Sequence, residues 1–108
     1  YKISKRFDDD ISSVCGSFSF SIKKNKIKKV AIAYGGMSEI PKRASIIEKK
    51  LIDSEFSEST FTKVVSFIDK DFSPLDDMRA SRNYRLSVAK NLLLKAFYEI
   101  KDNRNIRI

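Results

Sequence analysis

The sequence predicts an α+β fold, in which a small antiparallel sheet of two to three strands carries about three α-helices on one face. Two observations lead to this prediction. Residues 14–22 alternate apolar or small side chains with mostly hydroxylated ones, which is the period of a half-buried strand. Residues 43–52, 59–68 and 79–100 carry apolar side chains at helical spacing. Because a lone hairpin is unstable in water, these helices are expected to cover it.

A β-hairpin is predicted between Ile11 and Gly36. The apolar or small side chains of its first strand are those of Val14, Gly16, Phe18, Phe20 and Ile22. The polar run at residues 23–26 predicts the turn, and a second apolar run follows at residues 27–34. Gly35 and Gly36 end that run, and a pair of glycines after a strand indicates a turn with positive φ rather than a phosphate-binding loop. Residues 1–10 also alternate at their start, so they are a candidate third strand.

Three helices are expected after the hairpin. The first runs from about Arg43 to Ile52, with Ala44, Ile47 and Leu51 facing inward. A polar linker at residues 55–59 then leads to the second helix, which is predicted to begin at Ser59 or Thr60 because both are good N-cap residues. Its apolar stripe consists of Phe61, Val64, Val65 and Ile68.

The last predicted helix is the longest element of the chain. Residues 71–77 contain Pro, Ser and Asp and are predicted to form a loop. The helix then begins at Arg79 or Arg82 and ends at Ile100, with a broad apolar stripe that suits it to lie across the sheet. Residues 101–108 are polar and charged and are expected to be a frayed tail.

Length and composition predict one domain over residues 1–108. Hydrophobic residues make up 42% of the chain and charged residues 33%, as in an ordinary globular domain. A membrane span would need a run of about 18 apolar residues, and neither such a run nor a signal peptide is present in the sequence. The first residue is Tyr rather than Met, which leads us to expect a piece of a longer protein.

Several kinds of chemistry are excluded by residue counts. The chain has no His and one Cys, which excludes a zinc site and a Ser-His or Cys-His catalytic pair. The single cysteine, Cys15, is expected to be packed in a strand and indicates a reducing, cytoplasmic setting. Three consecutive carboxylates, Asp8, Asp9 and Asp10, lack the spacing of a calcium loop, so a turn that pairs with Lys5 and Arg6 is favoured.

The net charge of +8 leaves two alternatives open. A basic surface can bind nucleic acid or dock an acidic protein, or it can simply be solvated. Eight basic residues lie around the predicted hairpin turn and first helix: Lys23, Lys24, Lys26, Lys28, Lys29, Lys42, Arg43 and Lys49. Since no recognisable nucleic-acid-binding motif accompanies them, nucleic acid is not the expected partner.

Specific motifs carry more information than composition. The segments YKISKRFDDDIS, VCGSFSF, VAIAYGGMSEIPKRA and DFSPLDDMRASRNYRLSVAKNLLLKAF occur in this order. Together they resemble the C-terminal domain of the FAD-binding subunit of molybdenum hydroxylases, over roughly residues 1–100. The resemblance is greatest to bacterial xanthine dehydrogenases and more distant to the medium subunit of carbon monoxide dehydrogenases.

The resemblance implies a function that this chain cannot perform alone. It implies a xanthine dehydrogenase-like oxidoreductase of purine metabolism in which a molybdenum cofactor passes electrons through 2Fe-2S clusters to FAD and then to NAD. The expected partners are FAD-binding domains that precede Tyr1, a molybdenum-cofactor subunit and an iron–sulfur domain. This chain would help to close the flavin site and would hold no complete active site.

The resemblance also assigns roles to single residues. The lysine after the aromatic residue of the entry segment reaches the flavin, and Lys2 matches it. A cation there would favour the negative charge of the reduced flavin. The following segment, with Lys5, Arg6, Asp9 and Asp10, resembles a loop near the flavin's access route whose charges would tune the approach of NAD.

A second group of matching residues is expected to be structural. Asp77 or Ser81 is expected to cap the last helix, and Arg79 and Arg85 are expected to bind carbonyl or carboxylate groups at a domain seam.

Overall fold

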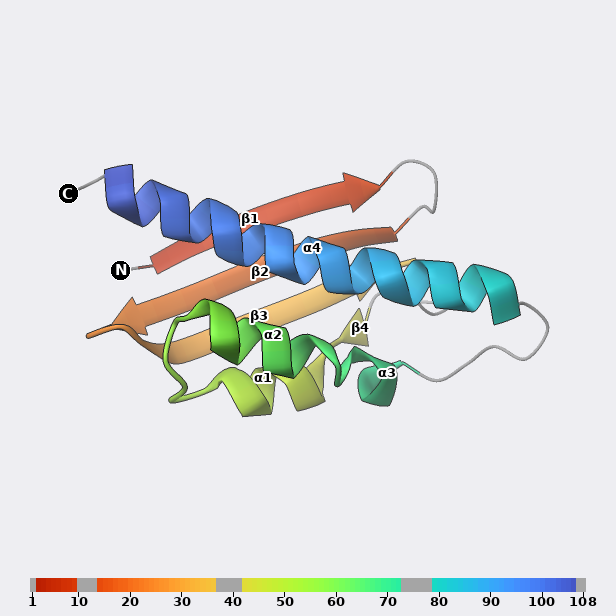
Figure 1. Cartoon of the computed structure of the whole chain (residues 1–108), viewed down its shortest axis with the longest axis horizontal. Coiled ribbons are helices and arrows are strands. Elements are labelled where there is room, and N and C mark those ends of the chain that lie inside the picture. Colours follow the sequence, from red (N-terminus) through yellow and green to blue (C-terminus); the bar gives the residue numbers. More distant parts are fainter. Residues whose placement is uncertain (1, 10–13, 37–41, 73–78, 107–108) are drawn as a thin grey trace.

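The structure, a computed structural model, describes residues 2–9, 14–36, 42–72 and 79–106, with the side chains of residues 9, 79–82 and 103–106 excepted. Four strands form one antiparallel sheet in the order β1-β2-β3-β4 (Figure 1). Their bounds are β1 Lys2–Asp9, β2 Val14–Lys23, β3 Lys26–Gly35 and β4 Lys42–Arg43. The helices are α1 Ser45–Leu51, α2 Glu58–Val65, α3 Ile68–Asp71 and α4 Arg79–Ile106. The α+β prediction is confirmed, with a fourth strand added at the edge of the sheet.

The predicted hairpin is formed by β2 and β3. Its tight turn contains Lys24 and Asn25, whose φ angles of 51° and 63° are those of the turn that matches the twist of a hairpin. A bulge shifts the register after Ser21, so that Ile22 pairs with Ile27 rather than with Lys28. The bulge therefore keeps Ile27 on the apolar face, where it is fully buried.

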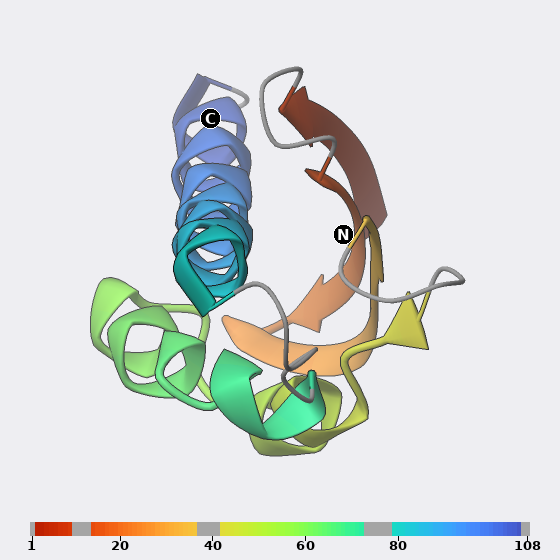
Figure 2. The same cartoon turned by 90° about the vertical axis from the view of Figure 1, so that its right-hand side faces the viewer.

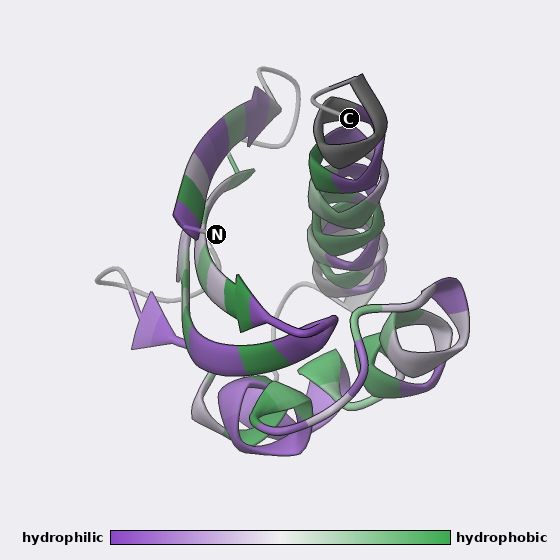
Figure 3. Ribbon diagram, turned by 90° about the vertical axis from the view of Figure 1, so that its left-hand side faces the viewer, coloured by the Kyte–Doolittle hydropathy of each residue, from purple (hydrophilic) through white to green (hydrophobic). Residues whose placement is uncertain are grey.

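The helices cover one face of the sheet. The sheet is curved, and α4 lies in its concave side (Figure 2). Helix α4 contacts β1 and β2, α1 packs against β3, and both α2 and α3 contact α1 and α4. Along the strands, hydrophobic and hydrophilic residues alternate (Figure 3). The buried strand residues are Val14, Gly16, Phe18, Phe20, Ile22, Ile27, Ile32 and Tyr34.

The first helix begins later than the sequence predicts. Lys42 and Arg43 form β4 against Tyr34 and Ala33 of β3, and the helix starts at Ser45. The amide of Ala44 donates to the carbonyl of Ile32, 2.8 Å away. Lys42 and Arg43 therefore pair with the edge of β3, because the amide and carbonyl groups of that edge need hydrogen-bond partners.

The segment between α1 and α2 is not the polar linker that was expected. Its residue Phe56 is buried, and the Phe56 amide donates to the carbonyl of Asn25, 2.8 Å away at the hairpin turn. The N-cap of helix α2 is Ser57 rather than Ser59 or Thr60, because the Ser57 side chain accepts a hydrogen bond from the amide of Thr60. The hydrogen bond between Phe56 and the hairpin turn fixes where helix α2 begins. The spacing of apolar residues in the sequence does not predict this contact.

The apolar stripe of the second predicted helix is divided between two helices. Helix α2 ends at Val65, and Ile68 belongs to the short helix α3. Asp71, which was expected in a loop, is the last residue of α3 and is buried. Its carboxylate accepts hydrogen bonds from the amides of Ile46 and Ile47 at 2.9 and 3.1 Å, so it joins α3 to the start of α1.

Helix α4 is the longest element, as predicted, and it crosses the sheet (Figure 1). Its buried side chains are Leu86, Val88, Ala89, Leu92, Leu93, Ala96, Phe97 and Ile100. The helix continues to Ile106, through most of the segment that was expected to fray. The Tyr34 hydroxyl donates to the carbonyl of Ala89, 2.7 Å away, which joins the sheet to the middle of the helix.

Candidate functional site

The face of the sheet opposite the helices is here called the open face. Strand register places five rows of side chains on it, because residues that pair directly across strands point to the same side. The helices lie on the other side of the sheet (Figure 2). The open face consists of Lys2, Ser4, Arg6, Asp8, Cys15, Ser17, Ser19, Ser21, Lys23, Lys26, Lys29, Ala31, Ala33, Gly35 and Arg43.

The centre of the open face is built from small, uncharged side chains. Ser4, Ser19 and Ala31 form one row, and the Ser4 hydroxyl donates to the Ser19 hydroxyl at 3.1 Å. At one end, Gly35 lies beside Cys15 so closely that a Cβ atom at Gly35 would be 2.7 Å from the Cys15 Sγ. The small size of the side chains at the centre of this surface therefore follows from residue choice.

Cations lie at the margins of the same face. One row runs Lys2, Ser21, Lys29 across three strands, with a lysine at each end. A second row runs Arg6, Ser17, Ala33, Arg43 across four strands, with an arginine at each end. The rows thus combine a neutral centre with charged ends.

Each arginine of the second row has an acidic partner. The Arg43 guanidinium donates to both carboxylate oxygens of Glu48, at 2.9 and 3.0 Å, and the pair is half-exposed on the Arg43 side. Arg6 pairs with Asp8 at 3.6 Å, and both side chains are exposed. The exposed Arg6–Asp8 pair contributes little stability, about 1 kcal/mol or less. The Glu48 carboxylate is mostly buried and also accepts a hydrogen bond from the amide of Ile32 at 2.8 Å, so the Arg43–Glu48 pair is tied to the sheet.

Two shallow hollows mark the open face. One, of about 370 Å³, is lined among others by Lys2, Ser21 and Lys29. The other, of about 420 Å³, is lined among others by Arg6 and Arg43. Each hollow is therefore flanked by two cationic side chains that belong to one row.

Lys2, the predicted flavin contact, is exposed on the open face and opposite Ser21. Lys29 lies at the other end of its row and was not predicted as a site residue. The alternation of the hairpin already places Lys29 on the same side as the serines. Its alignment with Lys2 depends on two strand registers and a bulge, which sequence patterns do not specify.

Lys5 and Arg6, which were expected to act together as a basic pair, lie on opposite faces of β1. Arg6 is exposed on the open face, whereas Lys5 pairs with Phe18 and is half-buried on the helix side. Nearby, the Lys95 ammonium of α4 lies 5.0 Å from the centre of the Phe7 ring. Successive strand residues point to opposite sides, so the two cations cannot form one cluster. The side chains of Asp9 and Asp10 lie outside the described residues.

Arg85 forms the kind of contact that was predicted for it. Its guanidinium donates to the carbonyl of Gly36 at 3.1 Å, joining α4 to the end of β3. Gly36 has a φ of 82°, the positive value expected for the second glycine of the pair. Asp77 and the side chains of Arg79 and Ser81 lie outside the described residues.

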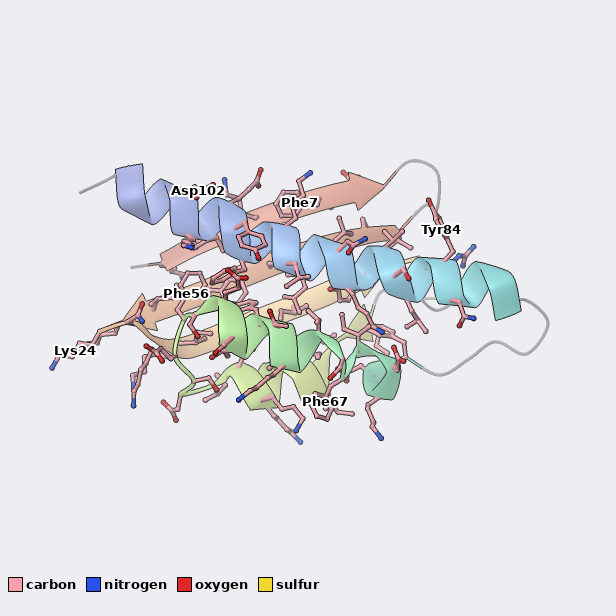
Figure 4. All side chains as sticks on the ribbon, in the orientation of Figure 1. Phe7, Lys24, Phe56, Phe67, Tyr84 and Asp102 are labelled. Atoms are coloured by element: carbon pink, nitrogen blue, oxygen red, sulfur yellow. The ribbon has the colours of Figure 1, made fainter. Side chains whose placement is uncertain are left out.

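The basic cluster of the hairpin and first helix is partly engaged in contacts within the chain. Lys28 pairs with Asp53 at 3.2 Å, Lys42 donates to the carbonyl of Asp71, and Arg43 binds Glu48. Lys24 instead projects from the hairpin turn, away from the body of the molecule (Figure 4). These contacts support the interpretation of this charge as surface and structural, and a nucleic-acid partner stays an unfavoured alternative.

The described residues show neither a cluster of metal ligands nor a membrane-spanning helix. No group of three or more His, Cys, Asp or Glu residues in this part of the chain lies close enough to hold a metal ion. None of the helices in the described part is both long and apolar enough to cross a membrane.

Comparison with protein families matches residues 1–100 to the CO dehydrogenase flavoprotein C-terminal domain. The chain belongs to this family. The predicted resemblance is thereby confirmed over the same residues, including the hairpin, the open face and most of α4. The match makes this chain the C-terminal domain of an FAD-binding subunit of the molybdenum hydroxylase type.

Individual relatives agree with the family. The chain is 31% identical over 100 residues to the glyceraldehyde dehydrogenase medium chain of Sulfolobus acidocaldarius, which covers 93% of this chain but 36% of the relative. Its fold is similar to a carbon monoxide dehydrogenase from Hydrogenophaga pseudoflava (TM-score 0.74, 12% identity, 87% of this chain and 34% of that one). It is also similar to quinoline 2-oxidoreductase from Pseudomonas putida 86 (TM-score 0.70, 20% identity, 91% and 35%). At these identities the two structures show the fold alone. The chain thus spans about a third of its relatives' length.

Proposed function

We propose that this domain closes one side of the flavin site in the FAD-binding subunit of a molybdenum hydroxylase, with Lys2 as its contact to FAD. The observation that carries the proposal is the position of Lys2. Within a domain of the CO dehydrogenase flavoprotein family, it stands on the open face beside a hollow that also has Lys29 on its margin.

The residues present fit the edge of a flavin and not a whole FAD molecule. Two ammonium groups suit a group that becomes negatively charged, and the small side chains of Ser19, Ser21 and Ala31 leave room for a flat ring at the hollow. The hollow is shallow, however, and the described strands offer backbone pairing rather than a glycine-rich phosphate loop. The remainder of FAD would then be bound by the chain outside these residues.

The chemical contribution of Lys2 would be electrostatic. FAD, when bound, supplies the electron-accepting ring. The Lys2 ammonium would stabilise negative charge that develops on that ring, and β1 holds this residue in place by its pairing with β2. Lys29, the second cation of the row, would add to the same field. The domain thereby tunes the cofactor without taking part in bond making.

The finer assignment rests on the sequence motifs. A xanthine dehydrogenase-like oxidoreductase of purine metabolism, with NAD as electron acceptor, remains our prediction for the whole protein. The molybdenum cofactor and 2Fe-2S clusters would be on partner domains or subunits, in a cytoplasmic setting consistent with the single cysteine. The named relatives differ in the substrates that their names contain, so the substrate is expected to be set by another subunit.

A redox titration of the full-length flavoprotein subunit tests the role of Lys2. Replacing Lys2 by Ala removes a positive charge near the ring and should lower the flavin midpoint potential by about 30 mV or more, which is about 1.4 kcal/mol for a two-electron couple. Lys63→Ala, at an exposed lysine on α2, is the matched control and should leave the potential unchanged. Equal potentials in both variants would remove Lys2 from the flavin site.

The visible absorption spectrum of the same subunit tests the wider proposal. A flavin band is expected in the purified wild-type subunit. A folded full-length subunit that never contains flavin would contradict the proposed function and leave the fold unaffected.

A further inference from the structure

We infer that the open face is the surface on which the preceding part of the same polypeptide docks. The inference rests on the proposed function, because that function supplies a preceding part. The occupant is the portion of the subunit that precedes Lys2. This portion would contact the small side chains at the centre of the open face. The cations that end the Lys2–Lys29 row and the Arg6–Arg43 row lie at the margin of the contact.

The composition of the open face differs from that of an ordinary solvated surface. One third of all residues in the chain are charged, yet β2 contributes Cys15, Ser17, Ser19 and Ser21 to the centre of this face, and its one charged residue there, Lys23, stands at the end of the strand beside the hairpin turn. An interface typically loses charge at its centre and keeps charged groups at its rim. The open face has this arrangement, since its lysines and arginines lie on β1, β3 and β4 or, in the case of Lys23, at the turn end of β2.

The shape of the face suits a close-packed protein surface. Serine and alanine side chains extend little above the strands, so a partner can approach the backbone closely. Ser17 and Ala31 are exposed in the structure, and the hollows beside them remain open to solvent. Apart from the hollow beside Lys2 and Lys29, this face of neutral, small residues offers little to a small ligand, since it has few groups that converge on one point.

The identity of the occupant follows from length and direction. The relative from Sulfolobus acidocaldarius is nearly three times as long as the stretch that this chain matches, and the family is a C-terminal domain. The missing portion of such a protein therefore precedes β1. Lys2, the first described residue, lies on the open face itself, at the edge of the sheet. A chain that arrives there has this face within immediate reach.

Cysteine accessibility in the full-length FAD-binding subunit tests the inference. Ser17→Cys places a thiol at the centre of the open face, and Ser59→Cys places one on the exposed surface of α2 as the matched control. Both substitutions exchange one small atom and should leave the fold intact. Each is made with Cys15→Ser, and labelling by a maleimide is followed on the peptide that contains the new cysteine. Both variants should label completely in denaturant.

Docking predicts that residue 17 labels about ten-fold or more slowly than residue 59 in the flavin-containing subunit purified without its partners, because labelling must wait for local opening. Equal labelling rates in a subunit that retains FAD would overturn the inference while the proposed function stands. Protection that appears only in the complete enzyme would assign the face to another subunit. Protection that is lost on dilution, together with dissociation of a dimer, would assign it to a second copy. Either result would overturn the occupant named here.

Discussion

The two faces of the sheet are made by the same strands but differ in almost every property. On the helix side, β2 presents Phe18 and Phe20, which are 1% exposed, and β3 presents the fully buried Tyr34. One residue further along the same strands, the open face presents serine and alanine. The alternation places both sets within one residue spacing of each other, since the side-chain period of a strand is two.

This difference shows how the domain separates stability from function. The helix side holds a continuous aromatic cluster around Phe61. The centre of its ring lies 5.8 Å from the ring centre of Phe20, 5.5 Å from that of Phe56 and 4.7 Å from that of Phe97. This cluster joins the sheet to α2, to α4 and to the segment between α1 and α2. Among its described contacts, the open face contributes one hydrogen bond between serines, the exposed Arg6–Asp8 pair and the Arg43–Glu48 pair at the edge of the sheet. Changes on the two faces should therefore have very different consequences.

The largest expected loss of stability is on the helix side. Phe61→Ala removes a fully buried ring from the aromatic cluster and should lower the free energy of unfolding by about 3–5 kcal/mol, because a cavity remains where the ring was. Urea unfolding of the 108-residue chain measures this change. Thr62→Ala, at the exposed neighbour on the same helix, should change it by about 0.5 kcal/mol or less. Similar losses in the two variants would mean that the cluster is not the core.

A smaller loss is expected at Asp71, which joins two helices beneath the same face. Asp71→Ala leaves the amides of Ile46 and Ile47 without their acceptor and should lower the free energy of unfolding by about 2–3 kcal/mol. The control is Asp69→Ala, whose carboxylate forms an exposed pair with Lys90 at 3.1 Å and should contribute about 1 kcal/mol or less. If Asp69→Ala were the more damaging change, the buried cap would not hold α1.

Tyr34 predicts how stability on the helix side depends on pH. Burial, and then the negative charge of Asp71, raise the pKa of Tyr34 well above its ordinary value of 10.0. As the pH rises above 10.0, the Tyr34 hydroxyl therefore loses its proton in the unfolded chain before it does so in the native state. The free energy of unfolding falls in that pH range and is unaffected by Tyr34 below it.

Tyr34→Phe tests this dependence. The variant should lose about 1 kcal/mol at neutral pH, because the hydrogen bond to Ala89 is removed, and it should lose less than the wild type on going to about pH 11. Unfolding by urea at both pH values gives the comparison. Parallel losses in the two proteins above pH 10.0 would show that Tyr34 does not contribute to the alkaline decrease.

The smallest effect is expected on the open face. Ser17→Arg introduces a long cation at an exposed position of the central strand and should change the free energy of unfolding of the 108-residue chain by about 0.5 kcal/mol or less. The same urea titration measures it. A loss comparable to that of Phe61→Ala would show that the two faces do not divide stability and function as described.

Local patterns identified much of this fold. The alternation of residues 14–22 and 27–34 identified the hairpin, and the helical spacing of Phe61 and Val64 identified the core side of α2. The motif at Lys2 supplied the predicted contact to FAD, which stays a prediction. The N-cap at Ser57, the strand at Lys42 and Arg43, and the division of α2 from α3 were missed, since each depends on pairing with a distant segment.

By itself, the sequence determined which residues are apolar, with what period, and hence that one face of the sheet is covered and the other is not. Only the tertiary structure decided which residues meet across strands and helices. The bulge after Ser21, the row of Lys2 with Lys29, and the acceptance of two α1 amides by Asp71 all follow from it. The physical reason is the distance along the chain over which each feature is determined. A backbone period is set within a few residues, whereas register and long-range hydrogen bonds are selected by the packing of the whole domain.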